Sequence, residues 1–190
     1  MNNCILTVGE NGFLLSNILK NNILKNNISF TDFQGDFSTV QELWFFGTPI
    51  DTSNVDRLCD YSTFFECLKV CQKFNIKMVY ASSYAVLYDD DLYAKVKSEH
   101  EEYIRANLKN YLILRLPRIY DKSRNAGLMK LLRENKVPEK DMSKEVTYCT
   151  LNMFIDFIEN VKSSKGVVNY PISKETVMIE SIQQIKNRFC

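Results

Sequence analysis

Tyr93 and Lys97 are the two residues whose types and spacing could most directly do chemistry. Residues four apart share one face of a helix, so the phenol and the ammonium would be neighbours there. A phenol with its ordinary pKa of about 10 is a poor acid or base at neutral pH. An ammonium about 4 Å away contributes on the order of 4 kcal/mol at an effective dielectric constant of about 20, which lowers that pKa by about three units. Tyr93 would then serve as a general acid or base.

A hydroxyl that could share a substrate oxygen with Tyr93 lies just upstream. Residues 77–83 predict a continuous buried strand that ends in two serines. Ser83, or its neighbour Ser82, would stand at the carboxyl end of that strand. A tyrosine and a lysine at this spacing also occur on ordinary helix surfaces, so the pair gains its meaning from the rest of the chain.

The N-terminal stretch predicts a strand, a tight glycine turn and a helix. A short apolar run leads into Gly9 and Gly12, and an apolar set with helical spacing begins at Phe13. Glycine lets the backbone turn sharply and approach another molecule, and the helix that follows directs N–H groups and partial positive charge outward. Such a corner suits a pyrophosphate, with Gly9, Asn11, Gly12 and Phe13 as binding residues. Leu15 replaces the third glycine of the dinucleotide fingerprint, and a plain strand-to-helix corner is the alternative.

Asp32 is the candidate for binding the adenosine ribose. It ends a second predicted strand, residues 28–32, and lies 20 residues after Gly12, the distance at which doubly wound folds place such a carboxylate. A carboxylate there repels a 2′-phosphate, which favours NAD over NADP; the alternative is a solvated loop aspartate. Gly47 and Thr48 close a third strand, where the backbone could pass against a cofactor or simply turn.

Helices alternate with strands along the chain, which predicts an α/β fold with a mostly parallel sheet. We expect helices over residues 13–25, 55–74 and from 93 onward. Nine residues, 33–41, separate the second and third strands, fewer than the dozen or so that a crossover helix needs, so a loop should join them. A further strand covers 111–120. Helices over 128–132, 151–161 and 179–189 and a strand over 166–171 complete a small lobe, so that 1–190 is a single domain and 121–190 its substrate-side lobe.

Composition narrows the class of protein. The net charge of +1 does not indicate the basic surface that proteins binding nucleic acid normally have. No apolar run reaches the roughly 18 residues of a membrane span. The start of the chain lacks the features of a signal peptide, so we expect a cytoplasmic protein whose six cysteines are reduced. No metal site is expected: the cysteines form no CxxC pair, and the acidic run 89–91 suits a helix cap better. For His100, a packed or solvated imidazole is favoured over a catalytic one.

These residues together resemble the extended short-chain dehydrogenase/reductase family, specifically its nucleotide-sugar epimerases, dehydratases and 4-ketoreductases. Residues 7–16 are similar to its glycine-rich turn and 79–83 with 86–88 to its serine strand. Tyr93 through Lys97, with Glu101, resembles its YxxxK helix, and 114–120, 146–148 and 166–169 resemble its later elements. Ser83 and Tyr93 are 10 residues apart where the family usually has a loop about twice as long. The resemblance therefore implies an abridged, Rossmann-like three-layer domain.

The resemblance also implies a function. The expected protein is an NAD(P)-dependent oxidoreductase or epimerase acting on a nucleotide-linked sugar, with Tyr93, Lys97 and Ser83 catalytic and Lys97 also holding the cofactor ribose. A homodimer through the helices flanking Tyr93 would follow the family pattern. The alternative is a dinucleotide-binding or interaction protein of the same fold that has lost its chemistry, and an unrelated α/β domain is a third.

Overall fold

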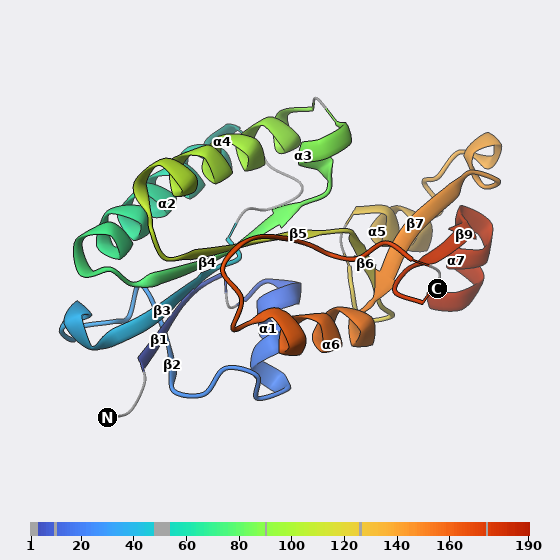
Figure 1. Cartoon of the computed structure of the whole chain (residues 1–190). Coiled ribbons are helices and arrows are strands. Elements are labelled where there is room, and N and C mark those ends of the chain that lie inside the picture. Colours follow the sequence, from blue (N-terminus) through green and yellow to red (C-terminus); the bar gives the residue numbers. More distant parts are fainter. Residues whose placement is uncertain (1–3, 10, 48–53, 90, 126, 174) are drawn as a thin grey trace. The chain divides into compact units, whose positions relative to one another are not determined.

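A six-stranded sheet organises the first part of the chain (Figure 1). The computed structural model describes residues 4–9, 11–47, 54–89, 91–125, 127–173 and 175–190. The strands are β1 (Cys4–Val8), β2 (Asn27–Ser29), β3 (Val40–Phe45), β4 (Lys77–Ser83), β5 (Tyr111–Leu116) and β8 (Gly166–Asn169), in the order β2-β1-β3-β4-β5-β8. β1 pairs in parallel with β2 and β3, β3 with β4, and β5 with β8. The mostly parallel α/β sheet predicted from the sequence is confirmed.

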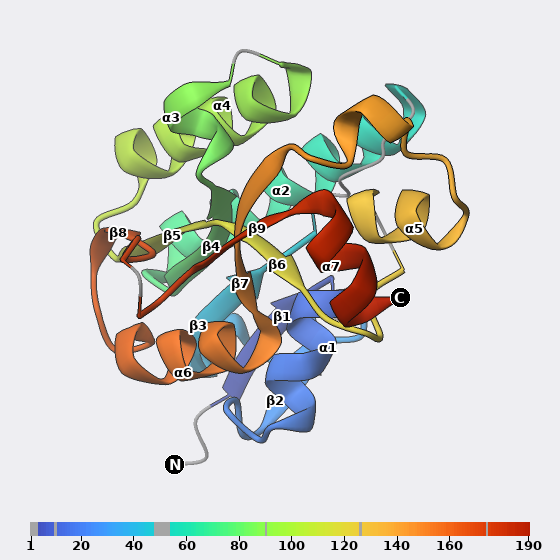
Figure 2. The ribbon, with the colours of Figure 1, turned by 90° about the vertical axis from the view of Figure 1, so that its right-hand side faces the viewer.

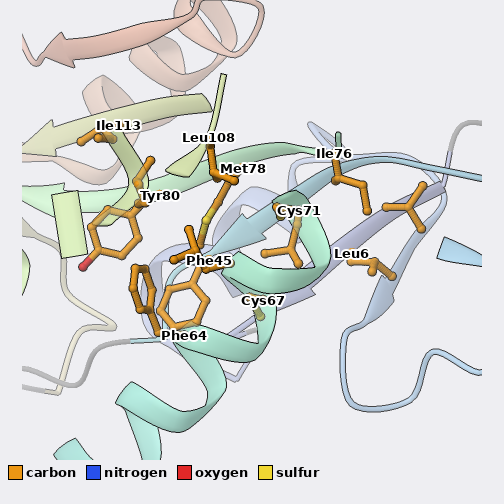
Figure 3. Close-up of a cluster of buried hydrophobic side chains, with 14 residues drawn as sticks. Leu6, Phe45, Phe64, Cys67, Cys71, Ile76, Met78, Tyr80, Leu108 and Ile113 are labelled. Carbon is orange, nitrogen blue, oxygen red and sulfur yellow. The ribbon is translucent and has the colours of Figure 1, made fainter. Parts of the chain in front are cut away.

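Helices cover both faces of this sheet. They are α1 (Phe13–Lys20), α2 (Asn54–Phe74), α3 (Ala85–Tyr88) and α4 (Leu92–Asn107). In Figure 1, α1 lies on one face, and α2 and α4 lie together on the other. Buried side chains from β1, β3 and β4 pack against α2 in one cluster, which Figure 3 shows in close-up and which includes Leu6, Phe45, Phe64, Met78 and Tyr80. Burying this apolar surface is what holds the sheet to its helices.

A loop replaces a crossover helix between β2 and β3, as predicted. Its only regular structure is a 3₁₀ turn, η1 (Phe37–Thr39), for which Asp36 accepts a hydrogen bond from the Ser38 N–H. The rings of Phe30 and Phe33 both pack against Phe37, which stacks in turn on Phe74 at the end of α2. Aromatic packing therefore covers this part of the core without a helix.

Residues 116–161 and 170–190 form a second unit with its own core. Its three-stranded sheet has the order β6 (Arg118–Tyr120), β7 (Glu145–Thr150), β9 (Met178–Ser181). Its helices are α5 (Gly127–Arg133), the 3₁₀ turn η2 (Glu139–Asp141), α6 (Leu151–Val161) and α7 (Ile182–Phe189), several of which are clearest in Figure 2. The first unit takes in residues 162–169, so β8 returns to the large sheet. That 121–190 form a substrate-side lobe stays a prediction.

Several predicted elements have different bounds in the structure. The second strand, predicted over 28–32, covers Asn27–Ser29, so Asp32 lies beyond its end, and the strand predicted over 166–171 ends at Asn169. The first helix ends at Lys20 rather than near Lys25. The single strand predicted over 111–120 is divided at Pro117, which has no N–H to donate, so that β5 and β6 belong to different sheets. The helix predicted from Ile179 begins at Ile182, after β9. None of the helices within the described residues is long and apolar enough to cross a membrane.

Candidate functional site

The carboxyl edge of the six-stranded sheet gathers most of the predicted site residues. Since β1, β2, β3 and β4 run parallel, their carboxyl ends share one edge. Gly9 follows β1, Asp32 comes three residues after β2, Gly47 comes two after β3, and Ser83 is the last residue of β4. Thr48 lies outside the described residues. In open α/β sheets this edge is where ligands bind.

Gly9 occupies a conformation that requires glycine. Its φ is +90°, and a Cβ there would lie 2.9 Å from the carbonyl carbon and oxygen of Phe46, at the end of β3. The Gly12 N–H donates to the Gly9 carbonyl at 2.8 Å, which closes the turn. This tight corner holds the start of α1 against the carboxyl ends of β1 and β3.

The start of α1 leaves room for an anion. Gly12 is its N-cap and has no side chain to cap the helix, and the first turn holds no acidic residue. Asn11 and Gly12 are exposed and Phe13 is half-buried. An uncapped helix start with exposed small or polar residues leaves room for an external anion. Leu15, in place of the third glycine, is fully buried with Ile18, so α1 forms with a leucine at that position.

Asp32 is exposed beside the end of β1. Its N–H donates to the Ser29 carbonyl at 3.1 Å, and the Phe30 N–H donates to Thr7 at 2.8 Å, which holds this turn next to the glycine corner. The carboxylate is therefore placed at the same edge as the start of α1 and faces solvent. That position is compatible with binding ribose hydroxyls.

Tyr93 and Lys97 share one face of α4. Asp91 caps this helix by accepting a hydrogen bond from the Ala94 N–H at 2.7 Å, as predicted for the acidic run, of which Asp90 lies outside the described residues. Lys97 is 3% exposed, and its Nζ donates to the Ala81 carbonyl of β4 at 2.7 Å. The same Nζ lies 5.9 Å from the centroid of the half-buried Tyr93 ring.

The two candidate serines have different surroundings. Ser82 is 4% exposed and donates to Glu101 Oε1 at 2.6 Å. Ser83 is half-buried at the sheet edge, and its Oγ accepts from the Ala85 N–H at 3.2 Å. Because the Ser82 proton is directed to a buried carboxylate, Ser83 is the better placed of the two to meet a substrate.

Glu101 is the centre of a buried polar network. It is 1% exposed and accepts hydrogen bonds from Ser82, from Arg115 at 3.0 and 2.6 Å, and from Arg105 at 2.9 Å. Burial alone would raise the pKa of Glu101, but the bonds from these three partners outweigh it and lower that pKa below its usual value. The sequence pointed to Glu101 only through the YxxxK resemblance, and it placed Arg115 only as a member of the predicted strand 111–120. A single arginine in the apolar strand 111–116 was the available signal.

His100 is packed, not solvated. It has no exposed surface, its Nδ1 lies 2.9 Å from the Tyr80 hydroxyl, and its Nε2 has no hydrogen-bond partner. Burial, and secondarily the charge of Lys97, lower the pKa of His100 to about 3. The imidazole is therefore neutral at physiological pH.

The second unit has a groove of about 400 Å³ that contains none of the predicted site residues. It is lined by Leu132, Arg133, Asn135, Lys186, Asn187 and Cys190. Within the part of the chain that the structure describes, no three His, Cys, Asp or Glu side chains gather as a metal site. Cys4, Cys67, Cys71, Cys149 and Cys190 are free thiols.

Comparisons with known proteins identify the fold. No protein-family model matches the sequence, and no curated protein matches it. The structure, in contrast, is similar to that of TunA, an NAD-dependent NDP-hexosamine 5,6-dehydratase of tunicamycin biosynthesis, with a TM-score of 0.73 and 15% identity over 96% of this chain and 78% of that one. It is also similar to dTDP-4-dehydrorhamnose reductase from Bacillus anthracis, solved with NADP, with a TM-score of 0.71 and 15% identity over 100% and 80% of the two chains.

A third similar structure is longer than this chain. The capsular polysaccharide assembling protein CapF from Staphylococcus aureus has a TM-score of 0.66 and 15% identity; the match covers 97% of this chain but only 56% of CapF. This chain therefore spans about half of CapF and about four fifths of the other two. The fold is Rossmann-like, and this chain shares it with TunA, with the dTDP-4-dehydrorhamnose reductase and with CapF.

Proposed function

We propose that this chain is an NAD(P)-dependent oxidoreductase or epimerase that acts on a nucleotide-linked sugar. The observation that carries this proposal is the placement of Lys97, whose Nζ is fixed to the end of β4 by the Ala81 carbonyl and lies 5.9 Å from the Tyr93 ring. Lys97 therefore brings a positive charge to the helix face of Tyr93 at the sheet edge where Ser83 lies. The fold shared with enzymes of this kind supports the proposal.

The residues at this edge would hold the dinucleotide. Gly9, Asn11, Gly12 and Phe13 would bind its pyrophosphate at the start of α1. Asp32 would accept hydrogen bonds from the adenosine ribose, with Gly47 and Thr48 alongside. Because a carboxylate repels a 2′-phosphate, NAD is favoured over NADP. The bound dinucleotide supplies the site from which hydride leaves or to which it is transferred.

Side chains of α4 and β4 would bind the substrate oxygen and transfer its proton. A substrate hydroxyl or keto oxygen would bind between the Tyr93 phenol and the Ser83 hydroxyl. Tyr93 would take up or release the proton on that oxygen, and the nearby Lys97 ammonium would stabilise its phenolate. Lys97 would also contact the nicotinamide ribose.

Tyr93→Phe tests this assignment. We expect the wild-type protein to bind NAD with a Kd in the micromolar range, more tightly than NADP, by isothermal titration calorimetry. Tyr93→Phe should keep that affinity but lose turnover by a factor on the order of 10² to 10⁴, since it removes only the proton-transfer group. Tyr103→Phe is the matched control, because Tyr103 lies on the same helix and is exposed. Full turnover in Tyr93→Phe would overturn the catalytic assignment.

A dinucleotide-binding protein without turnover is the second candidate. The 10-residue separation between Ser83 and Tyr93 and the leucine at position 15 favour it, because the first shortens the segment next to the substrate and the second departs from the fingerprint. A screen of UDP- and dTDP-linked sugars with either dinucleotide separates the two. An epimerase returns its NAD unchanged, so the sugars are followed by chromatography as well as by nicotinamide absorbance. Dinucleotide binding with no change in absorbance and no sugar converted would indicate a binding protein.

A further inference from the structure

Lys97 lies against a second tyrosine ring, which is outside the proposed catalytic set. Its Nζ is 4.7 Å from the ring centroid of Tyr80, closer than the 5.9 Å to the ring of Tyr93. Tyr80 belongs to β4 and is fully buried. The face of an aromatic ring attracts a cation, and this attraction is stronger where water is excluded. The Tyr80 ring therefore helps to determine where the Lys97 ammonium lies.

Contacts on its other sides hold the Tyr80 ring in place. Its hydroxyl and His100 Nδ1 are 2.9 Å apart. The His100 ring stacks on Phe64, with centroids 3.7 Å apart and planes at 3°. Tyr80 also packs on Phe45 and Phe64 with centroids 5.9 Å away in each case, and Figure 3 shows the three rings side by side. Tyr80 is thus fixed at its hydroxyl and along its ring.

We propose that Tyr80 is a positioning residue for Lys97: its ring holds the Lys97 ammonium beside Tyr93, and His100 holds the Tyr80 hydroxyl. The inference rests on the proposed function, in which Lys97 keeps the Tyr93 phenol acidic. It adds two buried residues that touch neither the dinucleotide nor the substrate.

The charges around this cluster fit the role. From β4, Tyr80 and the Ala81 carbonyl face Lys97; from α4, Tyr93 faces it. From α2, Phe64 and Tyr61 face His100, and the Tyr61 hydroxyl is bonded to Glu99 on the outer side of α4. Since His100 stays neutral far below physiological pH, it does not compete with Lys97 for the Tyr80 ring as a second cation.

The test is the pKa of Tyr93, measured by NMR on protein labelled with ¹³C at the tyrosine ζ carbon and assigned with Tyr93→Phe. In the wild type, Tyr93 should titrate below its ordinary value. Tyr80→Leu removes the ring, so the ammonium can move several ångströms away and the pKa of Tyr93 should rise by about one unit. Tyr80→Phe keeps the ring, which Phe45 and Phe64 still hold, but loses the bond to His100, so the pKa should rise by less than in Tyr80→Leu. Leu6→Ala is the control for a cavity in the same cluster, because Leu6 lies on β1 away from the Tyr80 ring in Figure 3, and it should leave the pKa unchanged.

Each other outcome overturns the inference. An unchanged pKa of Tyr93 in Tyr80→Leu, an equal rise in Leu6→Ala, or an ordinary pKa in the wild type would show that the Tyr80 ring does not act through Lys97. If Tyr80→Leu does not fold, the ε protons of Lys97 in the wild type and in Tyr80→Phe provide the readout: both should be shifted upfield by the ring, and unshifted protons would overturn the inference. Calorimetry with NAD tests the proposed function independently of this inference. A wild-type protein that does not bind NAD would contradict the proposed function, whatever the pKa of Tyr93.

Discussion

His100 shows what burial does to a single titratable side chain. In the folded protein its pKa is lowered to about 3, whereas the unfolded chain has an ordinary histidine that titrates near 6.5. Above pH 6.5 both states are neutral at this residue. As the pH falls below 6.5, the unfolded state binds a proton that the folded state does not, so stability is lost down to about pH 3.

We therefore predict that this protein loses stability on mild acidification because of His100. The free energy of unfolding should fall by about 2 kcal/mol between pH 7.5 and 5.0 from this residue alone. His100→Asn keeps a hydrogen-bonding amide near the position of Nδ1 and cannot titrate, so its loss of stability over the same pH range should be smaller by that amount. Urea denaturation at the two pH values measures both. Equal losses in the two proteins would contradict the prediction.

Helix α4 carries Tyr93 and Lys97, and the side chain of Glu101 bonds this helix to the sheet. The carboxylate bonds to Ser82 in β4 and to Arg115 in β5, while Lys97, one turn earlier, bonds to the Ala81 carbonyl. Two buried charged groups on one helix face thus tie α4 to the carboxyl ends of two strands. The positions of Tyr93 and Lys97 relative to Ser83 follow from these ties.

Replacing Glu101 with Gln should loosen this element. The amide keeps the shape and one acceptor oxygen but leaves the half-buried Arg115 without an anion, so we expect a loss of about 3 kcal/mol in the free energy of unfolding. Glu102→Gln is the matched control, because Glu102 is adjacent and exposed, and its effect should be within about 0.5 kcal/mol. Because the pKa of Glu101 is lowered, its contribution is present above pH 4.5 and is lost as the pH falls through the folded pKa. Similar losses in the two variants at pH 7 would show that the network does not stabilise α4.

At this scale the sequence predicts some elements well and others poorly, for physical reasons. The bounds of β4 and α6 agree with prediction because a continuous apolar run and a strong helical spacing each indicate one structure. In β9 the pattern is inverted: Ile179 is 60% exposed, while Glu180 is buried and accepts a hydrogen bond from the Tyr148 hydroxyl. The spacing of Tyr93 and Lys97 was visible in the sequence, but the ring of Tyr80 under Lys97 was not, because strand and helix meet only in the fold.

Over the whole molecule, the chain passes from the first unit to the second at Leu116, returns for residues 162–169 and leaves again at Tyr170. Each unit has its own sheet and its own buried cluster. All of the proposed cofactor-binding residues that the structure describes belong to the first unit. The proposed substrate-side lobe, 121–190, is mostly second unit. We therefore expect NAD to order backbone in the first unit and a nucleotide-linked sugar to order backbone in the second.

Hydrogen exchange read by mass spectrometry should separate these effects. NAD orders the backbone that it contacts, so it should slow exchange in peptides covering 9–20 and 29–32 and leave β7 and β9 unchanged. A nucleotide-linked sugar added to the NAD complex should then slow exchange in peptides of 121–161, if that part of the chain contacts the substrate. Adenosine alone is the control, and it should protect the turn at Asp32 more than the start of α1, because it carries the ribose but no pyrophosphate. Protection confined to the first unit with both ligands would contradict the substrate-side role of residues 121–190, and protection by NAD mainly in the second unit would contradict the placement of the dinucleotide at the glycine corner.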